Sequence, residues 1–227
     1  MGKVHIISKY RRLFLNRVEA GSLLGQELKR LNLEKPIVMG IPRGGIIIAR
    51  EASLILGCDM DIVLSRKLGA PGNPELAIGA IAEDGSVFLN EMISSRIGVY
   101  DSYIEQEKAR QLSVISARSA RYRSILPKAD LHERPVIITD DGIATGATMQ
   151  AALRVARREN PSYLIAAAPV GAEDSVSSLA GDADEVICLN TPPFFAGVGQ
   201  FYVEFTQVDD QTVEEIMREE AEKRAAG

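Results

Sequence analysis

The chain has 227 residues, of which 46% are hydrophobic and 25% are charged, and its net charge is −5. This size and composition are typical of one large globular domain with a buried core. The acidic balance argues against a nucleic-acid-binding protein, which needs a basic face, and no apolar run is long enough to span a membrane. We therefore expect a cytoplasmic protein that binds neither nucleic acid nor membranes.

The first part of the chain alternates predicted helices with predicted strands. Leucine and valine residues at helical spacing predict a helix at 17–31. Short apolar runs predict buried strands at 36–40 and 61–65, and a helix at 44–56 separates them. Strands that are joined through helices indicate a parallel sheet.

Turn-forming residues interrupt the middle of the chain. Two glycines and two prolines predict an irregular loop at 66–76. A hairpin is predicted at 77–90, with its turn at 83–86, and a long polar helix with a solvated charged face at 100–122. Because the segment 66–78 offers few backbone hydrogen bonds to regular structure, we expect it to be mobile.

The alternation returns in the last part of the chain. A strand begins at 136, a helix is predicted at 146–158, and further strands are predicted at 163–170 and 185–189 with a short helix between them. An amphipathic helix at 209–224 ends the pattern. The whole order predicts an α/β fold with a mostly parallel sheet flanked by helices. No repeat or linker divides the chain, so we expect one domain over 1–227 with its core at about 36–190.

A loop suited to a phosphate follows the strand that begins at 136. Ligands of open parallel sheets bind at the carboxyl ends of the strands, where this loop is expected to lie. Its N–H groups would open the next helix, and free N–H groups and the positive helix dipole favour an anion there. No Walker A lysine and no G-x-G-x-x-G is present, so triphosphate and dinucleotide sites lack their main signal. The predicted phosphate-binding residues are Ala144, Thr145, Gly146, Ala147 and Thr148.

The same strand ends on two adjacent acids, Asp140 and Asp141. Carboxylates repel a phosphate, but they accept hydrogen bonds from sugar hydroxyls. They also stabilise positive charge that builds on a sugar ring in an oxocarbenium-like transition state. A phosphate loop next to such a pair suits a 5-phosphorylated ribose. The alternative interpretation is an acid pair that caps a helix at a tight turn.

Two further positive elements follow neighbouring strands. Arg43, Gly44 and Gly45 lie between a predicted strand and helix, where bare backbone N–H groups beside an arginine can bind an anion. Arg66 and Lys67 follow the next strand. Two anion sites on either side of a diol site predict a phosphoribose that carries pyrophosphate, with Mg²⁺ to offset the charge. The alternative for the first element is a plain turn with a surface arginine.

These motifs resemble the type I phosphoribosyltransferase family. The matching stretches are IPRGG at 41–45, RKLGAPGNPELAIG at 66–79 and DDGIATGATM at 140–149. The resemblance implies a Rossmann-like sheet, a small hood formed by the N- and C-terminal segments, and a flexible active-site cover that carries a hairpin. It implies that Asp140 and Asp141 hold the ribose hydroxyls, directly or through Mg²⁺. It also implies that 144–148 wrap the 5-phosphate.

The resemblance further implies that Arg43, Gly44 and Gly45 form a pyrophosphate loop, often with a cis peptide, and that Arg66 and Lys67 act at the base of the cover. The implied reaction transfers a 5-phosphoribosyl group from phosphoribosyl pyrophosphate (PRPP) to a nitrogenous acceptor and releases pyrophosphate. Ala144 stands where 6-oxopurine enzymes of the family have an Asp, so the acceptor stays open. The alternatives are a non-catalytic PRPP-sensing regulator and a sugar-phosphate hydrolase, and a homodimer is left open.

Overall fold

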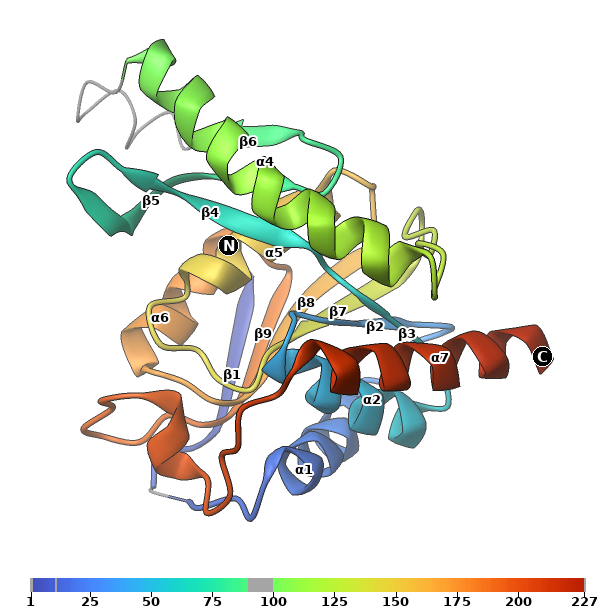
Figure 1. Cartoon of the computed structure of the whole chain (residues 1–227). Helices are drawn as coiled ribbons and strands as arrows, with labels where there is room; N and C mark the ends of the chain where they lie inside the picture. The colour runs from blue at the N-terminus through green and yellow to red at the C-terminus, as the bar shows by residue number, and fades with distance from the viewer. Residues whose placement is uncertain (1, 11, 90–99, 227) are drawn as a thin grey trace.

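The computed structural model describes residues 2–10, 12–89 and 100–226, which form an α/β fold around a six-stranded sheet (Figure 1). The strands follow the order β1-β9-β8-β7-β2-β3, and every neighbouring pair is parallel. The predicted α/β class with a mostly parallel sheet is therefore confirmed. The strands are β1 (Lys3–Ser8), β2 (Ile37–Gly40), β3 (Asp59–Ile62), β7 (Pro135–Thr139), β8 (Tyr163–Val170) and β9 (Glu185–Asn190).

Helices cover both faces of this sheet and bury a core on each side. One face carries α1 (Arg17–Lys29), α2 (Gly44–Leu56) and α7 (Asp210–Ala226), and the other carries α5 (Ala147–Arg157) and α6 (Glu173–Ser178). Among the described residues, no helix is both long and apolar enough to cross a membrane.

Glycines in α1 let its backbone approach α2 closely. A Cβ atom on Gly21 would lie 3.1 Å from the Cα atom of Ile48, and one on Gly25 would lie 3.0 Å from the Cα atom of Ala52. Contacts this short leave no space for a side chain, so the two helices are held together by backbone-to-backbone packing. This contact fixes the position of the first turn of α1, which carries Arg17.

Two parts of the main sheet differ from the sequence-based prediction. Strand β1 was not predicted; it lies at the sheet edge beside β9, and most of its side chains are exposed, so its apolar signal is weak. The strand predicted at 61–65 instead covers the end of β3, a connection and the start of β4. Val63 and Leu64 in that connection are buried, so the apolar run does not break where the strand ends.

The prediction of an irregular loop at 66–76 is wrong. This segment forms β4 (Ser65–Ala70) and the start of β5 (Asn73–Ala82), which pair antiparallel with register shifts next to Gly69. Together with β6 (Val87–Leu89) they make a three-stranded sheet. The predicted hairpin turn at 83–86 is confirmed, whereas Asn90 lies outside the described residues.

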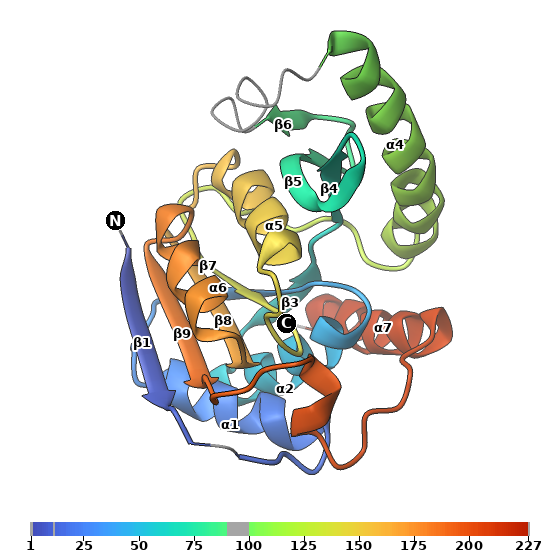
Figure 2. The ribbon, with the colours of Figure 1, turned by 90° about the vertical axis from the view of Figure 1, so that its left-hand side faces the viewer.

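Packing against a helix explains why this glycine- and proline-rich segment is extended. Leu68, Ile78 and Ile81 bury their side chains against Ile115 of α4 (Asp101–Arg123). Figure 2 shows β4, β5, β6 and α4 grouped on one side of the molecule, and β4 and β5 also contact α5. A buried face of this kind outweighs local turn propensity. Movement of the segment over a bound substrate stays a prediction.

A buried ion-pair network ties this subdomain to the main sheet. Arg123, at the end of α4, bonds Asp61 of β3 at 2.7 Å and Glu83 of the β5–β6 turn at 2.9 Å. Asp61 has no exposed surface, and it also accepts a hydrogen bond from the backbone N–H of Ala129 at 2.8 Å. Arg110 and Arg121 on the charged face predicted for this helix are exposed, whereas Arg123, one residue beyond the predicted range, points into the protein.

We predict that Arg123→Met destabilises the fold, because it leaves the buried Asp61 carboxylate without a cation. The expected loss in the free energy of unfolding is about 3 kcal/mol, measured by urea denaturation. Arg30→Met is the matched control, since the Arg30 side chain is 75% exposed and pairs only within its own helix in the described structure. A similar, small loss in both variants would contradict this account.

Candidate functional site

The acid pair lies where β7 leaves the sheet. The backbone N–H of Asp141 donates to Oδ1 of Asp140 at 2.8 Å, which fixes the Asp140 carboxylate against the backbone of the next residue. Oδ2 of Asp141 accepts a hydrogen bond from Nε of Arg17 at 2.7 Å. The hydroxyl of Tyr202 donates to the backbone oxygen of Asp141 at 2.7 Å. The pair is therefore held from the N-terminal and the C-terminal parts of the chain at once.

The two carboxylates share a poorly solvated environment. Burial, and then the adjacent charge of Asp141, raise the pKa of Asp140 well above its usual range. Burial also raises the pKa of Asp141, and the guanidinium of Arg17 opposes that rise. When both acids are ionised, the single guanidinium of Arg17 leaves one negative charge unbalanced. The arrangement therefore favours a cation, a sugar whose hydroxyl groups donate hydrogen bonds, or a group that gains positive charge.

The predicted anion loop after β2 lies directly against these acids. A Cβ atom on Gly44 would lie 2.0 Å from Oδ2 of Asp141, and one on Gly45 would lie 2.7 Å from the backbone oxygen of Thr139. Only glycine fits at either position. The peptide bond between Pro42 and Arg43 is cis, as the family resemblance implied. The structure thus brings Arg43, Gly44 and Gly45 to the acid pair.

The predicted phosphate loop opens α5 as expected. Gly146 stands immediately before the helix with a φ of +78°, a conformation that suits glycine. The backbone N–H of Ile143 donates to Val170 at 2.9 Å, which anchors the loop to the end of β8. Thr145 and Thr148 are exposed. The loop therefore presents hydroxyls and the start of a helix to solvent, next to the acids.

Arg66 and Lys67 lie on β4 and not in a loop. They line a cavity of about 200 Å³ with Thr148 of the predicted phosphate loop and with Pro42, the residue before the predicted anion site of Arg43, Gly44 and Gly45. Nε of Arg66 donates to the side chain of Gln111 on α4 at 2.6 Å. The two basic residues are consequently brought near the site, on a strand that α4 supports.

Sequence reasoning missed Arg17, the first residue of α1. Its side chain is only 9% exposed. Besides Asp141, it donates through Nη1 to the backbone oxygen of Thr206 at 2.9 Å, and its guanidinium lies 3.9 Å from the centre of the Phe205 ring. One signal was available: a cation in the first turn of a helix opposes the helix dipole, so it needs a compensating partner.

The segments that hold Arg17 lie side by side. The backbone N–H of Phe14 donates to Phe201 at 2.9 Å, and that of Val203 donates back to Phe14 at 2.9 Å. The rings of Phe14 and Tyr202 are in contact, with their centres 5.6 Å apart. The N- and C-terminal segments thus meet beside the acid pair. Their assignment as a hood stays a prediction.

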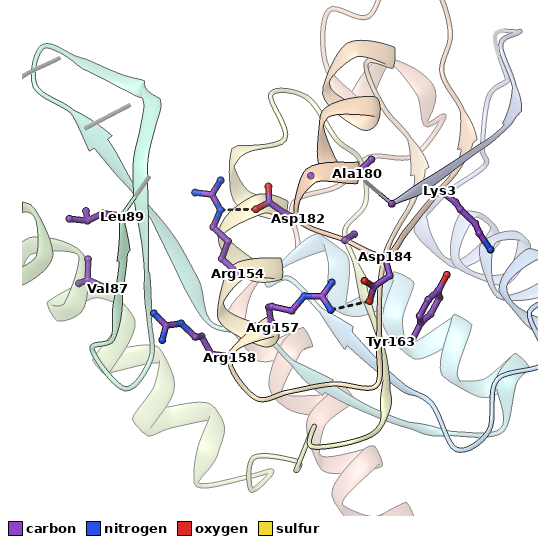
Figure 3. A pocket seen from close by; sticks show the side chains of 13 residues that line it. Lys3, Val87, Leu89, Arg154, Arg157, Arg158, Tyr163, Ala180, Asp182 and Asp184 are labelled. Carbon is purple, nitrogen blue, oxygen red and sulfur yellow. Dashed lines mark hydrogen bonds and ion pairs between the residues drawn. The ribbon is translucent and has the colours of Figure 1, made fainter. Parts of the chain in front are cut away.

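A second hollow, of about 960 Å³, lies at the other end of α5 (Figure 3). Its arginines are already paired: Arg154 bonds Asp182 at 2.9 Å and Arg157 bonds Asp184 at 3.0 Å. None of the residues predicted for the site lines this hollow. We therefore place the candidate site at the acid pair.

A sequence model of the phosphoribosyl transferase domain matches residues 16–206. The chain belongs to this family. The matched range contains Arg17 and every residue that was predicted for the site, and it ends before α7. The resemblance to type I phosphoribosyltransferases is thereby confirmed.

Two relatives in sequence carry the name of the same family. Two Mycobacterium tuberculosis proteins with provisional phosphoribosyl transferase names are each 41% identical over 202 residues, which cover 89% of this chain and 46% of theirs. The chain therefore spans about half the length of the curated relatives it matches. The crystal structure of TT1426 from Thermus thermophilus is 45% identical, with a TM-score of 0.86, over 91% of this chain and 98% of that one.

We predict that Gly45→Ala disrupts the candidate site, because the added methyl group would press on the backbone of Thr139 and Asp140. Overpacking against backbone atoms should cost about 1–3 kcal/mol in the free energy of unfolding, measured by denaturant titration. Gly181→Ala is the control, since a Cβ atom there meets nothing within 4 Å. Equal stability of the two variants would show that the loop can move away from the acids.

Proposed function

We propose that the chain is a Mg²⁺-dependent phosphoribosyltransferase that transfers the 5-phosphoribosyl group of PRPP to a nitrogenous acceptor and releases pyrophosphate. One observation carries the proposal: Asp140 and Asp141 lie between two backbone elements suited to anions. The loop of Gly44 and Gly45 contacts them on one side, and the loop that opens α5 follows them on the other. PRPP has a phosphate and a pyrophosphate at opposite ends of one sugar, so its charges match this order.

The 5-phosphate belongs at the start of α5. There the N–H groups of 144–148 and the hydroxyls of Thr145 and Thr148 supply donors, and the helix dipole favours the negative charge. Each charge-assisted hydrogen bond contributes roughly 1.5–3 kcal/mol. Several such bonds hold the 5-phosphate end of the donor while the chemistry takes place at C1.

The acid pair belongs at the ribose. Carboxylate oxygens of Asp140 and Asp141 accept hydrogen bonds from the sugar hydroxyls, and their charge stabilises the positive charge that develops on the ring as the bond to pyrophosphate breaks. The described residues contain no group of three or more His, Cys, Asp or Glu side chains that could hold a metal ion by themselves. Mg²⁺ fits this donor set, because it takes one or two carboxylates and completes its shell with waters and substrate oxygens. Bound there, it would neutralise phosphate charge.

The leaving group belongs at Arg43, Gly44 and Gly45, with Arg66 and Lys67 approaching from β4. The nitrogen lone pair of the acceptor forms the new bond to C1, and the electrons of the broken C1–O bond leave with pyrophosphate. Positive side chains and backbone N–H groups stabilise that charge as it forms. Positioning supplies the remaining advantage, so the site needs no strong base.

We predict that PRPP binds to the full chain only with Mg²⁺ present, and isothermal titration calorimetry measures this. Without the metal, the pyrophosphate and the acid pair repel each other. Release of pyrophosphate is then followed across a panel of bases and amines. Binding without turnover for any acceptor would favour a PRPP sensor, and release without an acceptor would favour a hydrolase. No binding with or without Mg²⁺ would refute the proposed site.

We predict that Asp140→Asn combined with Asp141→Asn lowers turnover at least about a hundredfold, because the charge opposite the developing cation is lost. The affinity for ribose 5-phosphate should change far less, since the loop that opens α5 holds the phosphate. Rates come from pyrophosphate release and affinities from calorimetry. Equal losses in both measurements would mean that the acids only support the loop.

A further inference from the structure

Two arginines face one cavity beside the acid pair. Arg17 and Arg43 line a space of about 370 Å³ together with Gly44, and the segment 205–208 forms its remaining wall. None of the described residues that line this cavity is acidic, although Asp141 bonds Arg17 and the charge of Asp209 interacts with that of Arg43. Arg43 is already placed at the leaving group, but Arg17 comes from a different helix. A cavity with two guanidinium groups and a bare glycine backbone is suited to a group with several negative charges.

The side chain of Arg17 is fixed before any ligand arrives. Asp141 and the backbone oxygen of Thr206 each accept one of its N–H groups, and Phe205 supports the flat face of the guanidinium. The Phe205 ring is itself held against Tyr202, with ring centres 5.1 Å apart. These two bonds use two of the five N–H donors of the guanidinium. Arg17 is therefore preorganised with donors left for an anion.

We propose that Arg17 is a second ligand of the pyrophosphate group, facing Arg43 across this cavity, and that 205–208 form the wall of the subsite. The inference rests on the proposed function and adds a residue to it. Phosphate oxygens accept paired N–H groups from an arginine, which a lysine cannot reproduce. Because Arg17 also bonds Asp141, one guanidinium contacts both the ribose side and the leaving-group side. Charge that moves onto pyrophosphate as C1–O breaks is then stabilised by Arg17 and Arg43 together.

The test is calorimetric titration of the full chain with pyrophosphate and Mg²⁺, repeated with ribose 5-phosphate. Arg17→Gln should weaken pyrophosphate binding about tenfold or more, as expected for a lost charge-assisted contact. Ribose 5-phosphate binding should weaken much less, because the loop that opens α5 holds that phosphate and Arg17 reaches the ribose only through Asp141. Arg17→Lys should restore only part of the pyrophosphate affinity. Arg12→Gln is the matched control: Arg12 is exposed, lies five residues earlier and contacts the Phe14 ring at 5.5 Å. It should behave as wild type.

The outcomes separate this inference from the proposed function. If Arg43→Gln loses pyrophosphate affinity and Arg17→Gln does not, the inference is wrong and the proposed function stands. If Arg17→Gln loses both ligands to the same extent, Arg17 only supports the fold and the inference is again wrong. If the wild-type chain binds neither PRPP nor pyrophosphate with Mg²⁺, both fail. Should Arg17→Gln not fold, Arg17→Lys decides, because it keeps the positive charge: wild-type affinity in that variant would contradict a paired contact.

Discussion

The close approach of the Gly44–Gly45 backbone to the acid pair is the constraint on which the rest of the site depends. Strands β2 and β7 are neighbours, and Gly40 is paired with Thr139, so the turns that follow them must meet at one edge of the sheet. Any side chain at Gly44 would collide with the Asp141 carboxylate. The absence of side chains lets the backbone of this loop lie directly against the acid pair, so a group suited to anions and a group suited to hydroxyl donors share one site.

Placing two adjacent carboxylates in a poorly solvated position costs free energy, and the chain offsets that cost from a distance in sequence. Arg17 comes from the first helix and bonds the Asp141 carboxylate. Tyr202 and Thr206 follow the last strand: Tyr202 bonds the backbone of Asp141, and Thr206 accepts a hydrogen bond from Arg17. Buried charges persist only when they are paired and hydrogen-bonded. The contacts between the two terminal segments thus help to stabilise the charge of the acid pair. The packing of α1 against α2 also helps, because it positions Arg17.

A buried charge is also paired where the subdomain of β4, β5, β6 and α4 joins the main sheet. Arg123 neutralises Asp61 inside the protein and thereby ties the helix to β3. This junction anchors α4, which packs against β4, and Arg66 and Lys67 take their positions from that strand. A basic pair on a supported strand is better placed for a charged leaving group than one on a free loop, because less conformational entropy is lost on binding.

The sequence by itself determined the parts whose physics is local. Apolar periodicity predicted the helices and most strands, and the acids, the glycine pair and the small-residue loop after β7 predicted a sugar-phosphate site, because strand order places such ends together. Tertiary structure alone decided three things. The run after Ser65 became strands because α4 buries one of its faces, and β1 formed because β9 offered an open edge. Arg17 reached Asp141 across 124 positions of sequence, since charge compensation inside a fold depends on distance in space and leaves little trace in local sequence.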